Sequence, residues 1–380
     1  MRILENLENL ESLENKKILL ICVTSQNVMT FRTGLIAALK ARGFEVSVVA
    51  FDEEYKTEIE GLGVDFYCIP DSNRSMNPFK ILSLQGKYEK LIKEIQPSTV
   101  FTFMLKPNTF GVQAARRVGV ANIYSMVEGA GDAFVQDSLK WKIVRGVVCF
   151  LYKQAFRYSK RVFFLNEDDK AEFLSRELVT AVQCEQINGV GIDLNKFEFK
   201  PMQNERNFLM VARMLQTKGI YEYCQAARLV KQKYPDAVFK YVGKEGDVTA
   251  EDLREYIDEK VIEYVGETKD VRPYYEECTA NVLPSWREGF GLVNAEAAAV
   301  GRPSITCDTI GTKETVRDGY NGFLTELKNP EELAEKIIYL IENPDEAKRM
   351  GENARTFAEE YFDQKRINEK ILSILEEYNE

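Results

Sequence analysis

The sequence contains no histidine among its 380 residues. This absence excludes Ser-His-Asp triads, Cys-His dyads, zinc sites of the HExxH type and any histidine that acts as a general base. The sequence has seven cysteines, none of them in a Cys-x-x-Cys pair, at positions 22, 68, 149, 184, 224, 278 and 307. Their odd number and mostly apolar surroundings favour buried, reduced thiols in a cytosolic protein.

Basic residues are fewer than acidic ones, and long apolar runs are absent. Lys and Arg total 50 against 60 Asp and Glu, a net charge of -10. The phosphate backbone would repel such a chain, so general nucleic-acid binding is excluded. No apolar run reaches the roughly 18 residues that a membrane-spanning helix needs. Residues 1–16 are acidic, unlike a signal peptide, and form an appended segment of unknown use. We expect a cytoplasmic protein.

Apolar runs and helical patterns alternate along the rest of the chain, and the alternation restarts after a polar stretch at 184–206. Such strands, separated by amphipathic helices, predict parallel sheets covered on both faces. We therefore expect two Rossmann-like α/β domains, at 17–184 and 185–360. A cleft facing the carboxyl ends of both sheets is the expected ligand site.

A last helical segment, within 361–380, carries isoleucines and a leucine on one face, at positions 367, 371, 374 and 375. That face needs a partner surface. Either domain could supply it, so one possible arrangement has the helix crossing back to the first domain.

The stretch from Pro284 to Pro303 is the most informative. A strand that ends at Pro284 enters a glycine-containing loop, and a helix begins near Gly291. The free N–H groups of such a helix favour an anion such as a diphosphate. Glu288 lies on the loop, and Glu296 lies in the helix, where it could accept hydrogen bonds from vicinal hydroxyls. On their own, two glutamates near a loop are more often solvated surface residues.

Glu288-x7-Glu296, within EGFGLVNAEAAAVGRP, resembles the signature of retaining glycosyltransferase family four, whose members have the two-domain GT-B fold. Arg213 and Lys218 resemble the family's Arg-x4-Lys phosphate clamp. Weaker similarities to a bacterial subgroup that acts on polyprenyl-diphosphate-linked sugars occur in the N-terminal half, at 77–79, 106–108 and 128–134.

The resemblance implies a role for each matched residue. Arg213 and Lys218 would neutralise the diphosphate in place of a metal, and the chain has no Asp-x-Asp motif to bind one. Glu288 would lie beside the donor sugar and Glu296 would hold the ribose. The loop residues Gly289, Phe290, Gly291 and Leu292 would complete the nucleotide-sugar site. No cofactor is implied besides this co-substrate.

The loops after the first, fourth and fifth strands of the N-terminal domain are expected to meet the acceptor. The candidates are Met29, Phe31, Arg32, Lys106 and Glu128. Without histidine, the group that activates the acceptor stays open between Glu128 and the departing phosphate.

Residues 138–166 contain seven basic residues and no acidic one, interleaved with aromatic and aliphatic side chains. A basic amphipathic helix of this kind can lie on an anionic membrane surface. The predicted contacts are Trp141, Lys142 and Arg145. The alternative is a core helix of the first domain whose solvated face happens to be basic.

The resemblance implies a retaining, metal-independent transferase. It would move a hexose or N-acetylhexosamine from a nucleotide sugar, with UDP favoured by the resemblance, to a lipid-linked sugar in surface polysaccharide or glycan assembly. Two alternatives stay open: a transferase with a soluble acceptor, and a non-catalytic protein that binds nucleotide sugars or glycans.

Overall fold

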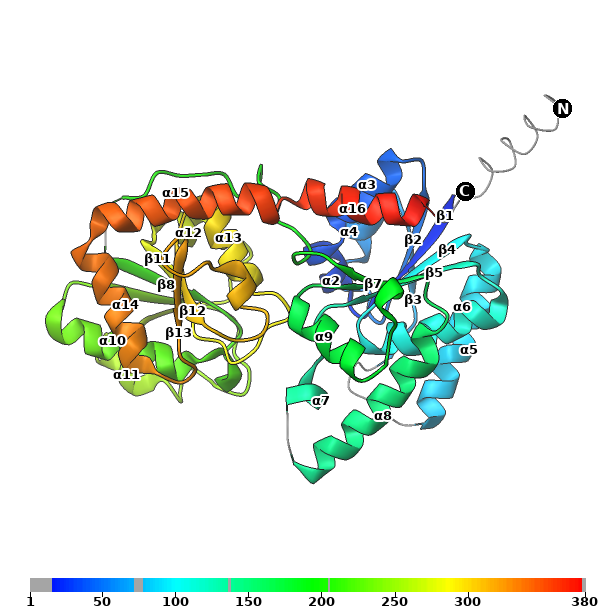
Figure 1. Ribbon diagram of the computed structural model, residues 1–380, viewed down its shortest axis with the longest axis horizontal. Coiled ribbons are helices and arrows are strands. Elements are labelled where there is room, and N and C mark those ends of the chain that lie inside the picture. The colour runs from blue at the N-terminus through cyan, green and yellow to red at the C-terminus, as the bar shows by residue number, and fades with distance from the viewer. Residues whose placement is uncertain (1–15, 72–77, 136–137, 204–205, 378–380) are drawn as a thin grey trace. The chain divides into compact units, whose positions relative to one another are not determined.

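The computed structural model describes residues 16–71, 78–135, 138–203 and 206–377. The chain divides into two compact α/β units, seen in Figure 1. Unit 1 comprises the residues up to Val190 together with those from Lys365 onward, and unit 2 comprises Gly191–Gln364. The acidic segment, apart from Lys16, and Asn77, the first residue of the similarity at 77–79, lie outside the described residues.

Unit 1 is built on a seven-stranded parallel sheet in the order β3-β2-β1-β4-β5-β6-β7. The central strands β1, β4 and β5 are almost entirely buried, as expected when helices cover both faces. The strands are β1 (Lys17–Ile21), β2 (Glu45–Ala50), β3 (Asp65–Cys68), β4 (Thr99–Phe103), β5 (Asn122–Val127), β6 (Arg161–Phe164) and β7 (Cys184–Gln186). The helices within the first part of the chain are α2 (Ser25–Phe31), α3 (Thr33–Ala41), α4 (Lys56–Glu60), α5 (Pro78–Ile95), the π-helical turn η1 (Pro107–Gly111), α6 (Val112–Val118), α7 (Asp132–Val135), α8 (Leu139–Phe156), α9 (Glu167–Ser175) and the short η2 (Ala181–Gln183).

Unit 2 has a six-stranded parallel sheet in the order β10-β9-β8-β11-β12-β13. Apolar side chains from β8, β9 and α10 form its buried core, together with residues of α14. The strands are β8 (Asn207–Val211), β9 (Val238–Val242), β10 (Glu263–Gly266), β11 (Ala280–Leu283), β12 (Ser304–Cys307) and β13 (Gly322–Thr325). The helices are the short η3 (Gln216–Lys218), α10 (Ile220–Lys233), α11 (Arg254–Asp258), α12 (Arg272–Glu277), α13 (Leu292–Val300), the short η4 (Lys313–Thr315), α14 (Pro330–Glu342) and α15 (Pro344–Tyr361).

The final helix, α16 (Gln364–Glu376), belongs to unit 1 from Lys365 onward. It buries Ile367, Ile371 and Leu375. Arg42 of unit 1 forms ion pairs with Glu369 and Glu376, at 2.5 and 2.7 Å. The crossing back to the first domain is therefore confirmed.

The sequence did not predict strands β7 and β13. β7 lies in the polar stretch at 184–206, where the sequence predicts no strand. It nevertheless pairs with β6 through Cys184, Glu185 and Gln186. It has three residues at the edge of its sheet, and all three are half-buried. A strand this short and polar lacks the apolar run on which the prediction depended.

Gly219 joins η3 to α10, and a substitution there tests how tightly the loops after the strands of unit 2 pack. It has a φ of +76°, and a Cβ there would lie 2.1 Å from the carbonyl oxygen of Pro284. We expect Gly219→Ala to lower the free energy of unfolding by at least about 2 kcal/mol, through strain and overpacking. Urea unfolding measures the change.

Gly86 in α5 provides the matched control, because a Cβ there meets nothing within 4 Å. Gly86→Ala should stabilise the protein by about 0.5–1 kcal/mol, the usual gain at an exposed helix position. Equal effects of the two substitutions would contradict the packing described for Gly219.

Candidate active site

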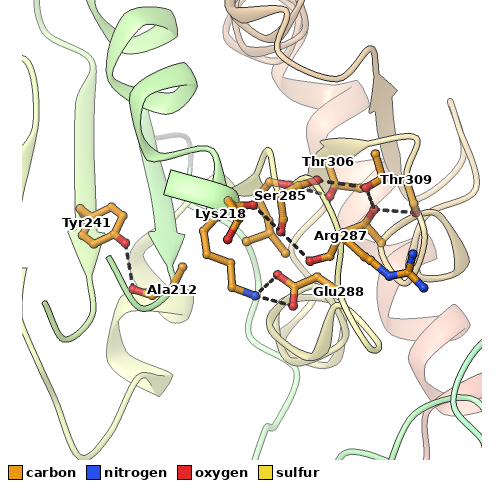
Figure 2. Close-up of polar contacts among 11 residues, drawn as sticks. Ala212, Lys218, Tyr241, Ser285, Arg287, Glu288, Thr306 and Thr309 are labelled. Atoms are coloured by element: carbon orange, nitrogen blue, oxygen red, sulfur yellow. Dashed lines mark hydrogen bonds and ion pairs between the residues drawn. The ribbon is translucent and has the colours of Figure 1, made fainter. Parts of the chain in front are cut away.

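Three loops at the carboxyl edge of the unit 2 sheet are joined by hydrogen bonds. They follow β8, β11 and β12, which are neighbours in a parallel sheet and so end at the same edge. Trp286 N–H donates to the Thr217 carbonyl at 2.9 Å, and the Thr309 hydroxyl donates to the Ser285 carbonyl at 3.0 Å. At the end of β8, the Tyr241 hydroxyl holds the Ala212 carbonyl at 2.9 Å (Figure 2).

Lys218 and Glu288 form an ion pair across two of these loops. Figure 2 shows the Lys218 Nζ facing both carboxylate oxygens of Glu288, each at 2.6 Å. The two side chains are 23% and 17% exposed, so water reaches the pair only in part. Residues 70 positions apart in the sequence therefore meet at one point, and a ligand can still approach them.

The Glu288 backbone is fixed by the loop that follows β12. Its N–H donates to the Ile310 carbonyl at 2.9 Å. Gly311 has a φ of +80°, and a Cβ there would lie 2.1 Å from the Glu288 carbonyl oxygen. A side chain at position 311 would displace the carboxylate, so glycine is required for this close approach.

Arg213, the other member of the predicted clamp, lies just beyond β8 and is exposed. Its guanidinium forms no ion pair or side-chain hydrogen bond with the residues that the structure describes. Arg213 therefore provides a positive charge that no carboxylate of the described chain neutralises.

The amino end of α13 supplies fewer free amides than the sequence predicted. Gly291 N–H donates to the Gly311 carbonyl at 2.5 Å, so it is already used within the protein. Across the described ranges, the N–H groups of Phe290 and Leu292 have no such acceptor. Gly289 is half-buried on the same loop. The amides of Phe290 and Leu292 thus stay available to an anion, whereas that of Gly291 does not.

Glu296 lies one turn into α13 and is largely enclosed by protein. Its carboxylate accepts a hydrogen bond from the buried Tyr275 hydroxyl at 3.0 Å. Burial raises the pKa of Glu296 to about 7, and the Tyr275 hydrogen bond and the nearby Lys196 charge lower it by less. A carboxyl group with this pKa changes charge near neutral pH.

In unit 1, Arg32 and Glu128 form an ion pair at the carboxyl edge of the sheet. Arg32 is buried, and its guanidinium stacks over the Phe103 ring at 4.0 Å. Burial lowers the pKa of Arg32 to about 10, still far above neutral, so the guanidinium is charged. Phe31 precedes Arg32 at the end of α2 and is half-buried. Two of the residues predicted to meet the acceptor therefore contact each other directly.

Lys106, also predicted, is buried and forms a 2.5 Å ion pair with Asp71. No sequence motif indicates Asp71 as a site residue. The available signal was its position just after β3, at the same edge of the sheet as Lys106.

The basic stretch predicted to contact a membrane forms α8. Trp141 packs against a core cluster of unit 1, Arg145 is half-buried and Lys142 is exposed. Within the described ranges, no helix has the length and apolar character to cross a bilayer, and no group of three or more Cys, Asp or Glu side chains is placed to hold a metal ion.

Each of the two units matches the model of a known protein family. Residues 17–165 match the family described as "Glycosyl transferase 4-like", and residues 191–357 match "Glycosyl transferases group 1".

Relatives include an N,N'-diacetylbacillosaminyl-diphospho-undecaprenol alpha-1,3-N-acetylgalactosaminyltransferase of Campylobacter jejuni, 29% identical over 92% of this chain and 95% of its own length. A UDP-Gal:alpha-D-GlcNAc-diphosphoundecaprenol alpha-1,3-galactosyltransferase of Escherichia coli is 25% identical over 79% of this chain and 81% of its own.

Solved structures share the architecture along nearly the whole chain. Anabaena Alr3699/HepE in complex with UDP-glucose has a TM-score of 0.78 at 20% identity, covering 95% of this chain and 99% of its own. A glycosyltransferase from Rickettsia africae has a TM-score of 0.77 at 21% identity, covering 96% and 98%. Since the two family models together take in both parallel-sheet units, this chain belongs to the glycosyltransferases that have the GT-B fold.

Proposed function

We propose that this enzyme transfers a hexose or N-acetylhexosamine from a UDP-sugar to a sugar on a polyprenyl-diphosphate lipid. The reaction would retain the anomeric configuration, need no metal, and serve surface polysaccharide or glycan assembly. The observation that carries the proposal is the meeting of Lys218 and Glu288 at the strand-end loops of unit 2. The Campylobacter and Escherichia relatives are named for diphospho-undecaprenol sugars, which supports the acceptor class.

The proposed role of the cations is to stabilise the departing UDP. As the bond to the sugar breaks, negative charge grows on the β-phosphate, and Arg213 and Lys218 would neutralise it. The amides of Phe290 and Leu292, at the positive end of α13, would add to this field. Fixed charges aimed at developing charge usually supply the largest catalytic contribution.

Donor binding would require Lys218 to exchange partners. Its ammonium is held by both oxygens of Glu288, so a diphosphate must compete with that carboxylate. Once Lys218 turns to the phosphate, Glu288 is free to accept hydrogen bonds from the sugar hydroxyls or to stabilise positive charge on the ring. The ion pair would thereby couple recognition of the diphosphate to recognition of the sugar.

We propose that unit 1 binds the acceptor through Arg32, Phe31 and Lys106. A proton taken up by Glu128 would leave the buried Arg32 charge without its partner, which is costly. The departing phosphate carries no such cost. We therefore favour the phosphate oxygen as the group that takes the acceptor hydroxyl proton, on the face from which UDP leaves, with Glu128 positioning Arg32.

The lipid acceptor would place the enzyme at the cytoplasmic face of a membrane as a peripheral protein. Two other functions are tested by the same assay, which follows release of UDP with and without polyprenyl-diphosphate sugars. A soluble-acceptor transferase would release UDP with a free sugar acceptor instead. A non-catalytic binding protein would release none.

Replacing Arg213 removes a charge that nothing in the described chain neutralises. We expect Arg213→Ala to lower transfer by about 10²- to 10³-fold, since the leaving group loses a fixed positive neighbour. Initial rates with a UDP-sugar panel and lipid-linked acceptor measure the loss. Arg254→Ala, at another exposed arginine of unit 2, is the control and should leave the rate unchanged. Near-normal turnover of Arg213→Ala would contradict the clamp.

Glu288→Gln separates donor binding from transfer. The substitution removes the carboxylate that competes for Lys218, so we expect UDP to bind about three- to tenfold more tightly while transfer is lost. Calorimetry with UDP measures the change, and uridine, which has no phosphate, should bind both proteins equally. Unchanged or weaker UDP binding would show that the ion pair does not open for the diphosphate.

The raised pKa of Glu296 predicts that the free energy of unfolding depends on pH. Between the ordinary value near 4.5 and about 7, the folded state binds more protons than the unfolded state, so stability falls as pH rises through this window. Glu296→Gln should therefore stabilise the protein at pH 8 by about 3 kcal/mol, and by little at pH 4.5. It should also weaken nucleotide binding, because a carboxylate that accepts ribose hydroxyls is lost.

Urea unfolding at the two pH values, with calorimetry for UDP, checks this prediction. Glu267→Gln is the control, at an exposed glutamate of the same unit, and should show neither effect. A stability gain that is the same at both pH values would contradict the assigned pKa.

A further inference from the structure

Helix α8 carries a stripe of exposed apolar side chains. Leu139, Ile143, Val147 and Phe150 are 77, 64, 49 and 62% exposed. Their spacings of four, four and three residues place them on one face of the helix. We call these four residues the α8 stripe. The amino-terminal half of α8 extends beyond the neighbouring elements of unit 1 in Figure 1.

The opposite face of α8 already has its partner. Val148, Tyr152, Ala155 and Phe156 are buried, and Tyr152 and Phe156 stack with ring centroids 4.9 Å apart. A surface helix normally turns polar residues outward once its apolar face is packed. The α8 stripe breaks this pattern, and a contiguous exposed apolar patch marks an interaction surface.

The charges around the stripe indicate what covers it. Lys142 and Lys153 lie along one side of the stripe and Lys140 along the other, all three exposed. Lys153 also pairs with Glu177 at 3.2 Å. No acidic residue occurs between 138 and 166, although the whole chain has a net charge of -10. A local reversal of charge beside apolar side chains complements an anionic lipid surface.

We propose that the α8 stripe inserts into an anionic bilayer, with the helix lying in the plane of the interface and its lysines among the headgroups. This membrane contact rests on the proposed function, because an enzyme with a lipid-linked acceptor needs to reach a lipid surface. It also moves the contact predicted at Trp141 to the opposite face, because Trp141 packs against the core of unit 1. The surface would hold the enzyme where its lipid-linked acceptor resides.

Sedimentation with vesicles tests the proposal on the full chain. Wild-type protein should bind vesicles of phosphatidylcholine with phosphatidylglycerol, and bind phosphatidylcholine alone at least about tenfold more weakly. Ile143→Asp with Phe150→Asp should reduce binding to the anionic vesicles by about tenfold or more. Both side chains are exposed, so the fold should persist, and circular dichroism checks that it does.

Two matched variants separate the apolar and charged contributions. Val182→Asp changes another exposed apolar side chain of unit 1, at 76% exposure, and should leave binding intact. Lys140→Gln with Lys142→Gln should weaken binding to anionic vesicles and reduce its dependence on salt. Equal wild-type binding to neutral and anionic vesicles would overturn the proposal, as would unchanged binding of the Ile143→Asp, Phe150→Asp variant.

A self-association surface is the competing outcome. A dimer in gel filtration that the two aspartates abolish, without any vesicle binding by the wild type, would overturn the bilayer proposal. Vesicle sedimentation uses neither donor nor acceptor. Its failure would therefore leave the transferase assignment standing, and failure of the transfer assay would leave the membrane surface standing.

Discussion

The ion pair between Lys218 and Glu288 is the interaction on which the account of the donor site depends. It exists because β8 and β11 are parallel neighbours, so that the loops after them leave the sheet at one edge. Gly219 and Gly311 allow these loops to approach more closely than any side chain would permit. The geometry of the pair is thus a consequence of the sheet and of two glycines, and the chemistry proposed for the site follows from it.

Each unit contains candidate site residues whose charge is opposed by burial or is not neutralised by a carboxylate of the described chain. Glu296 is a carboxyl group whose ionisation is opposed by burial, and Arg213 has no neutralising partner in the described chain. Arg32 carries its charge in a buried position, where Glu128 and the Phe103 ring contact its guanidinium. Such arrangements are expected where binding a charged substrate recovers the cost, and they are where stability and function oppose each other.

Much of the architecture could be predicted from the sequence, because long apolar runs and amphipathic helices carry the periodicities on which prediction depends. β7 could not be predicted because it has only three residues, two of them polar, at the edge of its sheet. The meeting of Lys218 with Glu288 and of Lys106 with Asp71 could not be read from spacing, since each pair joins separate βα loops. The use of the Gly291 amide within the protein, likewise, depends on the path of the loop near Gly311.

For α8, the composition of the sequence alone does not determine which apolar face of the helix is exposed. Counting basic and aromatic residues favours Trp141 as the membrane contact, whereas packing against unit 1 leaves the α8 stripe exposed. Which apolar face of a helix is buried depends on the surface it packs against, and that surface comes from distant parts of the chain.

A crystal structure of the enzyme with UDP would show whether the Lys218–Glu288 ion pair opens when the diphosphate binds. We expect the Lys218 Nζ to leave Glu288 and contact the diphosphate together with Arg213, while Glu296 accepts hydrogen bonds from the ribose. UDP bound with the Lys218–Glu288 pair still closed and Arg213 remote from the phosphates would contradict this expectation.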